Sequence, residues 1–236
     1  MIKKRLNVMC MKKIFIYSLV LGLCTTGLTS CNDDEDQTTD TRVTYFAQLE
    51  LLGDEFIEMN VGETFTDPGF VATEAGEDIT AKVVVTGSVN TSVGAFYRLN
   101  YSVSNVDGFA VSAQRLVMVK DPDNFASAYY GESQYGTRHY YGAPITISDL
   151  GGGNYLIDDI LGGFYAYGRY PNYSLDFLLE AVIHLNDDNT IELVQFGDWY
   201  WGSDVPDLIA GSYDPATGTV SLELDFGSPF LVTLTK

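Results

Sequence analysis

The sequence has few basic residues, and its charge is strongly negative. Its 236 residues include 13 Lys and Arg against 32 Asp and Glu. Five of the bases and none of the acids lie in residues 1–30, so the remaining chain has eight bases against 32 acids and a net charge of −24. A polyanion repels the phosphate backbone, whose neutralisation by Lys and Arg supplies most nucleic-acid affinity. The composition therefore excludes nucleic acid as a partner.

Cysteine and long apolar runs are also scarce. Cys10 and Cys24 lie in the N-terminal segment, which leaves Cys31 alone in the rest of the chain. We therefore expect no internal disulfide there, and a chain of about 200 residues buries enough surface to fold without one. A single long apolar run and an ordinary apolar content of 46% exclude a multispanning membrane protein and a disordered chain.

The sequence lacks the residue patterns of common catalytic and metal sites. His139 and His184 are the only histidines, which is too few for a zinc site built from the usual His and Cys sets. The acidic turns at 121–124 and 186–189 do not follow the spacing of an EF-hand. No Ser-His-Asp arrangement, phosphate loop or dinucleotide fingerprint is present. We expect no metal and no cofactor.

Residues 1–30 have the three regions of a secretory signal peptide. Lys12 and Lys13 precede the apolar run 14–23, and small and polar residues follow. The motif Leu28-Thr29-Ser30-Cys31 resembles the lipobox of bacterial lipoproteins, which implies cleavage before Cys31 and lipidation of that residue. A retained apolar helix is the alternative, but the run is shorter than the roughly 20 residues that a membrane span needs.

Residues 31–42 are predicted to form a solvated tether. The acidic run Asn32-Asp33-Asp34-Glu35-Asp36 and the polar residues after it offer no apolar side chain for packing. This run resembles the surface-export signal of Bacteroidetes lipoproteins, and a solubilising linker is the alternative. The resemblance implies a protein that is held at the outer membrane by its lipid anchor only, on the cell surface.

Residues 43–121 alternate apolar and polar side chains in short runs between turn residues. The clearest expected strands are 56–59, 82–85, 96–103 and 113–119. About seven short strands in roughly 80 residues are typical of an Ig-like β-sandwich. The motif Gly-Glu-Thr-Phe-Thr-Asp-Pro-Gly-Phe-Val-Ala at 62–72, with the matching segments that follow it, resembles the bacterial Ig-like module of pesticidal crystal proteins and many cell-surface proteins. That resemblance implies a spacer or adhesion unit.

The turn-forming stretch 120–124 is the predicted boundary, and residues 122–236 form a second β-domain. The expected strands are 143–148, 155–160, 164–169, 176–185, 190–196, 208–213, 219–226 and 230–234. Short turns between them favour an antiparallel β-barrel or β-sandwich, which makes the whole protein all-β. The segment 155–165, with 189–193 and 211–214, resembles the C-terminal β-domain of uncharacterised Bacteroidetes surface lipoproteins, which often accompany polysaccharide-uptake machinery.

Aromatic residues give the second domain its candidate ligand site. Side chains alternate along a strand, so Trp199 and Trp201 are expected on one face, beside Tyr200. The same alternation groups Tyr165, Tyr167 and Arg169. Tyr and Trp offer sugars a flat apolar face with a polar group, and Asp198 and Asp204 would add hydrogen-bond acceptors. The alternative is that these aromatic residues fill the core or pair across strands.

Carboxylates are abundant, so Asp158 and Glu180 are only a weak candidate pair for glycoside hydrolysis. Asp158 and Asp159 point to opposite faces of a strand, and we expect one of them to lie inward, hydrogen-bonded to a nearby turn. With no hydrolase motif in the sequence, we expect no catalytic residues.

The sequence as a whole predicts a non-catalytic, lipid-anchored surface protein that binds a polysaccharide or oligosaccharide as an accessory to polysaccharide uptake. The alternative is a structural or partner-docking subunit of an outer-membrane transporter complex that binds no glycan. Exposure of both Trp199 and Trp201 favours the first hypothesis, and burial of both favours the second.

Overall fold

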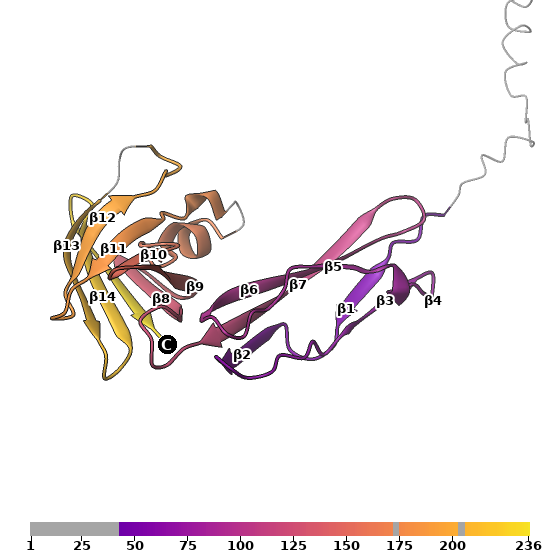
Figure 1. Ribbon diagram of the computed structural model, residues 1–236. Helices are drawn as coiled ribbons and strands as arrows, with labels where there is room; N and C mark the ends of the chain where they lie inside the picture. Colours follow the sequence, from indigo (N-terminus) through magenta and orange to yellow (C-terminus); the bar gives the residue numbers. More distant parts are fainter. Residues whose placement is uncertain (1–42, 172–174, 203–205) are drawn as a thin grey trace, which may run out of the picture. The chain divides into compact units, whose positions relative to one another are not determined.

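The computed structural model describes residues 43–171, 175–202 and 206–236. The predicted signal peptide, lipidated Cys31, acidic tether and Asp204 lie outside these residues. Residues 45–236 form one compact unit, and its regular structure is almost entirely β, as predicted (Figure 1). Within the described residues, no helix has the length and hydrophobicity to cross a membrane.

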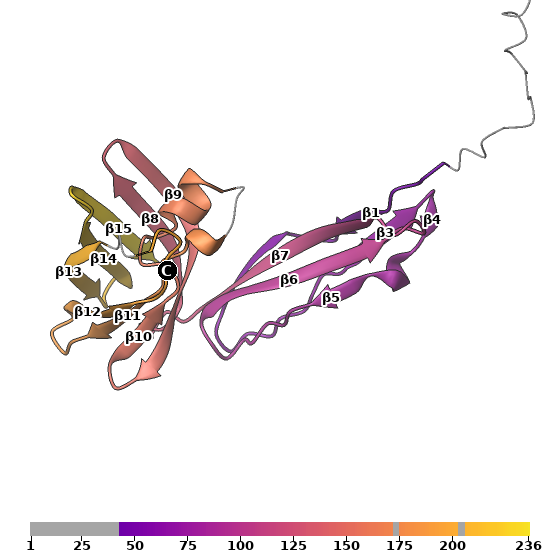
Figure 2. The same cartoon turned by 90° about the horizontal axis from the view of Figure 1, so that it is seen from above.

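The N-terminal half of this unit is the predicted Ig-like sandwich. One sheet has the order β1-β3-β4 and the other the order β2-β7-β6-β5. Strands β6 and β7 form a long antiparallel pair that runs side by side in Figures 1 and 2, and β2 joins β7 in parallel. The bounds are β1 (Gln48–Leu51), β2 (Phe56–Asn60), β3 (Phe70–Glu74), β4 (Glu77–Asp78), β5 (Val84–Thr86), β6 (Ala95–Ser104) and β7 (Ala110–Lys120).

The apolar side chains of the sandwich form two small cores. One core contains Ala72, Ile79 and Val103, and the other contains Met59 with Val117 and Val119 of β7. The strand expected at 82–85 begins two residues later, because a 3₁₀ turn (Thr80–Lys82) precedes it.

A buried arginine ties the turn of the 62–72 motif to the sandwich. Arg115 of β7 is 0% exposed and forms an ion pair with Asp67. Its guanidinium also donates to the carbonyls of Leu52, at 2.5 Å, and Asp54, at 3.0 Å. The Tyr101 hydroxyl donates to the second Asp67 oxygen at 2.6 Å. The motif therefore has a structural role: its Asp67 neutralises Arg115, and Arg115 satisfies several backbone acceptors.

The C-terminal half is an antiparallel, nearly closed barrel with the strand order β12-β11-β10-β9-β8-β15-β14-β13. The first and last strands of that order meet at the bridge between Thr190 and Ser212, and the Tyr213 amide donates to the Asn189 carbonyl at 2.9 Å. The bounds are β8 (Ala128–Tyr135), β9 (Arg138–Gly151), β10 (Asn154–Ile157), β11 (Ala181–Leu185), β12 (Ile191–Phe196), β13 (Asp207–Asp214), β14 (Thr219–Asp225) and β15 (Pro229–Thr235).

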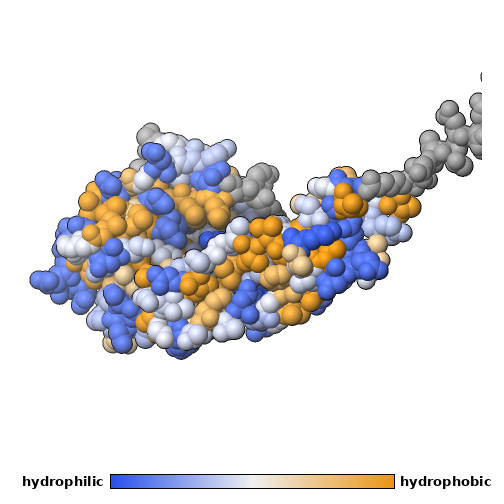
Figure 3. Space-filling view, turned by 45° about the vertical axis from the view of Figure 1, so that its right-hand side comes forward, coloured by the Kyte–Doolittle hydropathy of each residue, from blue (hydrophilic) through white to orange (hydrophobic). Residues whose placement is uncertain are grey.

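The barrel has the larger core. Its interior is filled by alternating side chains of every strand, among them Ile145 and Ile147 of β9 and Val220 and Leu222 of β14. On the face shown in Figure 3, apolar residues form several separate patches among hydrophilic ones. The buried side chains fill the interior of the barrel, so a ligand can bind only at its ends or on its surface.

Several expected strands of this half are wrong. Residues 164–169 form the π-helix η2 (Phe164–Arg169), and 176–185 begins with the 3₁₀ helix η3 (Leu175–Phe177), so that β11 starts only at Ala181. Strand β10 ends at Ile157, because the chain turns at Asp158 and Asp159. Strand β8, which the sequence analysis did not predict, pairs with both β9 and β15.

Replacing Arg115 by Leu should destabilise the sandwich. The variant leaves the Asp67 carboxylate unpaired, and removing one partner of a buried ion pair costs about 3–5 kcal/mol. We expect about 3 kcal/mol, the lower end, because the Asp67 side chain is 29% exposed. Chemical denaturation followed by circular dichroism measures the free energy of unfolding.

Lys120→Leu is the matched control for this prediction. It removes the ion pair between Lys120 and Glu58, whose side chains are 23% and 39% exposed. Exposed ion pairs contribute at most about 1 kcal/mol, so equal losses in the two variants would contradict a special role of Arg115.

Candidate functional site

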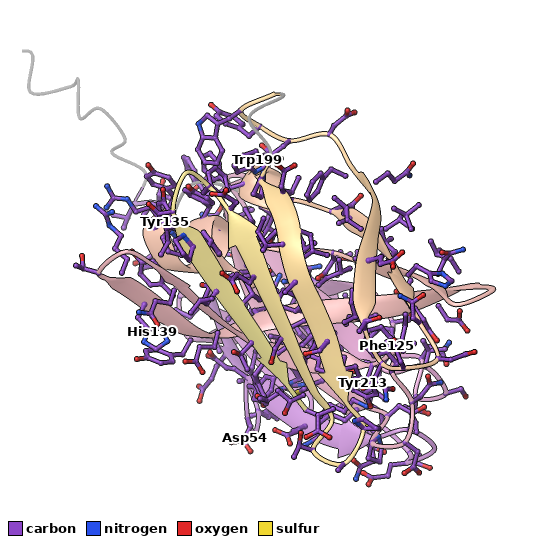
Figure 4. The ribbon with its side chains drawn as sticks, turned by 90° about the vertical axis from the view of Figure 1, so that its left-hand side faces the viewer. Asp54, Phe125, Tyr135, His139, Trp199 and Tyr213 are labelled. Atoms are coloured by element: carbon purple, nitrogen blue, oxygen red, sulfur yellow. The ribbon has the colours of Figure 1, made fainter. Side chains whose placement is uncertain are left out.

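An aromatic pocket of about 310 Å³ lies at one end of the barrel. Helix η2 and the residue after it supply Tyr165 and Tyr170, the turn after β12 supplies Trp199 and Trp201, and Phe226 follows β14. Figure 4 shows Trp199 and Tyr135 toward this end of the barrel and Phe125 and Tyr213 toward the opposite end. The pocket therefore gathers side chains from three separate parts of the sequence.

The two tryptophans do not form the expected same-face pair. Residues 199–202 form a turn, in which the Gly202 amide donates to the Trp199 carbonyl at 2.9 Å. The strict alternation of side chains holds only within a strand, and β12 ends at Phe196. The two indole rings meet edge to face, with centroids 4.9 Å apart and an interplanar angle of 78°.

The tryptophans also differ in burial. Trp199 is 8% exposed, belongs to the barrel core, and donates from its indole Nε1 to the Phe177 carbonyl at 3.3 Å. Trp201 is 38% exposed. Phe177 stacks against the Trp201 indole at 5.0 Å with an interplanar angle of 20°. Trp199 therefore forms a wall of the pocket, and Trp201 presents aromatic surface to solvent.

Two tyrosines complete the wall of the pocket around Trp201. The Tyr165 ring lies 4.8 Å from the Trp201 ring, and the Tyr170 ring lies 6.3 Å from it. Tyr165 and Tyr170 are nearly parallel, at 16° and 6.2 Å. Burial raises the pKa of Tyr165, and the nearby guanidiniums of Arg138 and Arg169 oppose that rise. The Tyr165 phenol therefore stays protonated at neutral pH and keeps its capacity to donate a hydrogen bond.

The remaining predicted residues are divided between the pocket and other surfaces. Tyr167 is wrongly grouped with Tyr165, because side chains two residues apart on a helix do not face each other. Its hydroxyl accepts a hydrogen bond from Arg98 of β6 at 2.7 Å. Arg169 is exposed next to the pocket, with its guanidinium carbon 5.5 Å from the centroid of the Tyr170 ring.

Tyr200 and Asp198 lie on the outside of the same turn. Tyr200 is 63% exposed and packs against the edges of Phe177 and Trp201. Asp198 is exposed. The described residues that line the pocket include neither of them.

The pocket residues that the sequence analysis missed are Tyr170 and Phe226, with Phe177 behind Trp201 and Arg138 nearby. Tyr170 directly follows the predicted residue Arg169 in the sequence, so its aromatic side chain was a usable signal. Phe226 gave no signal, because only the closure of the barrel brings it close to Trp199, at a ring distance of 5.7 Å.

The buried acidic residue is Asp159, and it serves the fold. It is 0% exposed, and its carboxylate accepts hydrogen bonds from the amides of Leu161, Gly163 and Leu179. This confirms the expectation of an inward Asp bound to a nearby turn. Burial raises the pKa of Asp159 to about 7, against the lowering effect of these three amides.

Its neighbour Asp158 accepts a hydrogen bond from the Thr146 amide at 2.9 Å. Burial raises the pKa of Asp158 to about 6. Glu180 is exposed, and its carbonyl accepts a hydrogen bond from the Gly197 amide at 2.8 Å. The residues that line the aromatic pocket include none of these carboxylates.

The two histidines make ordinary side-chain contacts. His139 lies 2.6 Å from a Glu132 oxygen and 2.9 Å from the Tyr141 hydroxyl, and His184 lies 3.0 Å from Asn154. In the part of the chain that the structure describes, no group of three or more His, Cys, Asp or Glu side chains is placed to hold a metal ion.

Comparison with known proteins assigns the chain to a class and a family. Residues 49–119 match the family model of the bacterial surface protein Ig-like domain, and residues 120–236 match that of a C-terminal domain. The class is thus that of bacterial surface proteins with an Ig-like domain. The crystal structure of the lipoprotein BT2262 from Bacteroides thetaiotaomicron is 32% identical, with a TM-score of 0.60, and the match covers 81% of this chain and all of that one. The chain belongs to the family of this lipoprotein.

Other solved structures are much less similar. The structure of CBM51-2 in complex with GlcNAc and INT domains from Clostridium perfringens ZmpB is 14% identical, with a TM-score of 0.27, and the match covers 75% of this chain and 29% of that one. A multidomain protein including DUF1735 from Bacteroides ovatus is 13% identical, with a TM-score of 0.28, and the match covers 58% and 55%. These scores are too low to support a functional argument. A search of curated proteins found no match.

The raised pKa values of Asp158 and Asp159 predict that acid stabilises the barrel. A carboxyl whose pKa is higher in the folded state binds more protons there, so the free energy of unfolding falls as the pH rises from about 4 to about 7. We expect a higher midpoint of thermal unfolding at pH 5 than at pH 8, measured by tryptophan fluorescence.

Asp158→Asn should reduce this pH dependence and leave the part that comes from Asp159, because the amide does not titrate and still offers an oxygen to the Thr146 amide. The same substitution at the exposed Asp187 is the control and should keep the wild-type profile. A profile for Asp158→Asn that matches the wild type would contradict the assignment.

Proposed function

We propose that this surface protein binds carbohydrate in its aromatic pocket, without catalysis, as an accessory to polysaccharide uptake. The observation that carries the proposal is the partly exposed Trp201, which stands with Tyr165 and Tyr170 around a cavity of about 310 Å³. Aromatic rings pack against the apolar C–H faces of sugars, and tyrosine hydroxyls exchange hydrogen bonds with sugar hydroxyls. The pocket combines both groups.

The size of the pocket suits a small part of a glycan. Small-molecule sites span roughly 300–1,000 Å³, so the cavity lies at the lower end of that range. Phe177 stacks against the Trp201 indole and fixes its orientation, which lowers the entropy lost on binding. Such a site is suited to one sugar ring or the end of a chain.

The positions of the carboxylates support a non-catalytic role. Glycoside hydrolysis needs two carboxyl groups that face each other across the scissile bond. Asp159 instead uses its carboxylate to hold backbone amides, and Asp158 holds the Thr146 amide. The described residues that line the pocket are all aromatic.

The proposal includes a location at the outer membrane, on the cell surface. It is supported by the membership in a lipoprotein family and by the match to a surface Ig-like domain. Lipidation of Cys31 would attach the chain to the membrane through the predicted tether, and the sandwich would act as a spacer. A transporter complex in the same membrane is the proposed protein partner.

One observation favours the alternative of a partner-docking subunit. Phe46 and Phe109 of the sandwich are 67% and 54% exposed, and their rings contact each other at 5.5 Å. Exposed aromatic pairs of this kind are common in protein interfaces. The burial of Trp199 also removes half of the tryptophan pair on which the carbohydrate hypothesis was first based.

Trp201→Ala should weaken glycan binding. The test is affinity electrophoresis of residues 32–236, which contain the whole compact unit, through gels with a panel of neutral and acidic polysaccharides. We expect one polysaccharide to retard the wild type, and the variant to lose affinity about tenfold or more, because central aromatic side chains contribute about 2 kcal/mol or more to binding.

Phe109→Ala is the matched control, since it removes an exposed aromatic side chain from the sandwich and should leave the retardation unchanged. Circular dichroism confirms that both variants are folded. Failure of every polysaccharide to retard the wild type would reject the proposal and favour the docking subunit.

A further inference from the structure

Basic side chains are so few in this protein that their positions are informative. Four of those in the described residues have partners within the fold: Arg115 pairs with Asp67, Lys120 with Glu58, Arg98 with the Tyr167 hydroxyl, and Lys236 with the Asn124 carbonyl. Lys82 is exposed on the sandwich. The two that remain are Arg169, which contacts the pocket residue Tyr170, and Arg138, which is paired with Tyr135 beside the pocket residue Phe226.

Arg169 reaches the pocket from η2. It is the last residue of that helix and is exposed, and its guanidinium carbon lies 5.5 Å from the centroid of the Tyr170 ring. Tyr170 lines the pocket. A guanidinium that lies over an aromatic ring keeps its N–H groups directed outward in the plane, available to an anion.

Arg138 reaches the same end of the barrel from β9. It is exposed and pairs in register with Tyr135 of β8. The Tyr135 hydroxyl donates to the carbonyl of Phe226, which lines the pocket, and the two rings lie 6.0 Å apart. Figure 4 shows Tyr135 and Trp199 at this end. The two arginines are also close enough to Tyr165 to act on its hydroxyl.

No carboxylate of the described residues neutralises either guanidinium. Among the described residues, no ion pair joins Arg138 or Arg169 to a carboxylate, although the chain has 32 acidic residues. Arginine binds carboxylates and other oxyanions through two parallel N–H donors, with more geometric specificity than lysine. The pocket thus combines a surface for a sugar ring with two anion-binding groups that no described carboxylate neutralises.

We propose that the pocket selects an acidic sugar, whose anionic group is bound by Arg138 and Arg169 while its ring packs on Trp201. This inference rests on the proposed function and names its ligand class. The anionic group is a uronate carboxylate or a sulfate ester, which present similar oxygen atoms to a guanidinium.

The test measures affinity electrophoresis of residues 32–236 in gels that contain one polysaccharide each. Polygalacturonate and alginate supply carboxylates, dextran sulfate supplies sulfate esters, and dextran and galactan are neutral. The variant Arg138→Gln/Arg169→Gln keeps hydrogen-bond donors but removes both charges. We expect it to lose affinity for the acidic polysaccharide about tenfold or more, because hydrogen bonds between two charged groups are much stronger than those from a neutral amide.

Lys82→Glu is the matched control, because this one substitution changes the net charge by the same two units as the double variant and lies on the sandwich. Retention of acidic-glycan binding in this control, with its loss in the double variant, supports the inference. Retardation by polygalacturonate or alginate assigns a uronate, and retardation by dextran sulfate alone assigns a sulfate ester.

Three results would overturn the inference while the proposed function stands, and the first two concern the wild type and the arginine variant. One is retardation by neutral polysaccharides only, and the other is acidic-glycan binding that depends on Trp201 but not on the arginines. Equal weakening by Lys82→Glu and by the double variant would show a general charge effect and would also overturn the inference. A wild type that no polysaccharide retards would reject both proposals.

Discussion

The buried carboxylate of Asp159 accepts hydrogen bonds from three backbone amides, and the aromatic pocket depends on the turn that these bonds hold. The amides of Leu161 and Gly163 follow in the same turn, whereas Leu179 begins the return to β11. The turn passes through Gly162 and Gly163 at φ of 59° and 84°, and a Cβ on Gly163 would lie 2.0 Å from that of Ala143. Tyr165 and Tyr170 follow this turn.

Arg115 fulfils the corresponding role in the sandwich. In both halves, one buried charged side chain forms hydrogen bonds with backbone groups that are not paired in a strand ladder. A buried backbone group without a partner would cost free energy. Arg115 is neutralised by Asp67. Burial raises the pKa of Asp159 to about 7, which gives the barrel a carboxyl group that titrates near neutral pH. The fold therefore links barrel stability to pH.

The sequence predicts a strand well where apolar and polar side chains alternate along the whole strand. Strands β14 and β15 lie within one residue of the expected bounds, and so do β2 and β12.

Strand β8 is not predicted because Ala128–Tyr135 contains tyrosine, glycine and polar residues in place of alternating aliphatic ones. The helix η2 was mistaken for a strand because Phe164–Arg169 alternates aromatic and small residues, a pattern that also lets Phe164 and Ala166 pack inward from a helix. Composition located the candidate site, but the orientation of its rings follows from tertiary contacts.

The contrast between the whole chain and its pocket narrows the choice of ligand. A body with a net charge of −24 repels anions at long range, but the Debye length is about 8 Å at physiological ionic strength, so distant charges are largely screened. The charges nearest a ligand then determine the electrostatic part of its binding energy. At the pocket these charges include Arg138 and Arg169. A neutral sugar would gain little from two charged guanidiniums, whereas an anionic group that reaches them exchanges hydration for paired N–H donors. Aromatic rings alone would not favour an anion, so under the proposed function the arginines are the feature that would give the pocket a preference for acidic sugars.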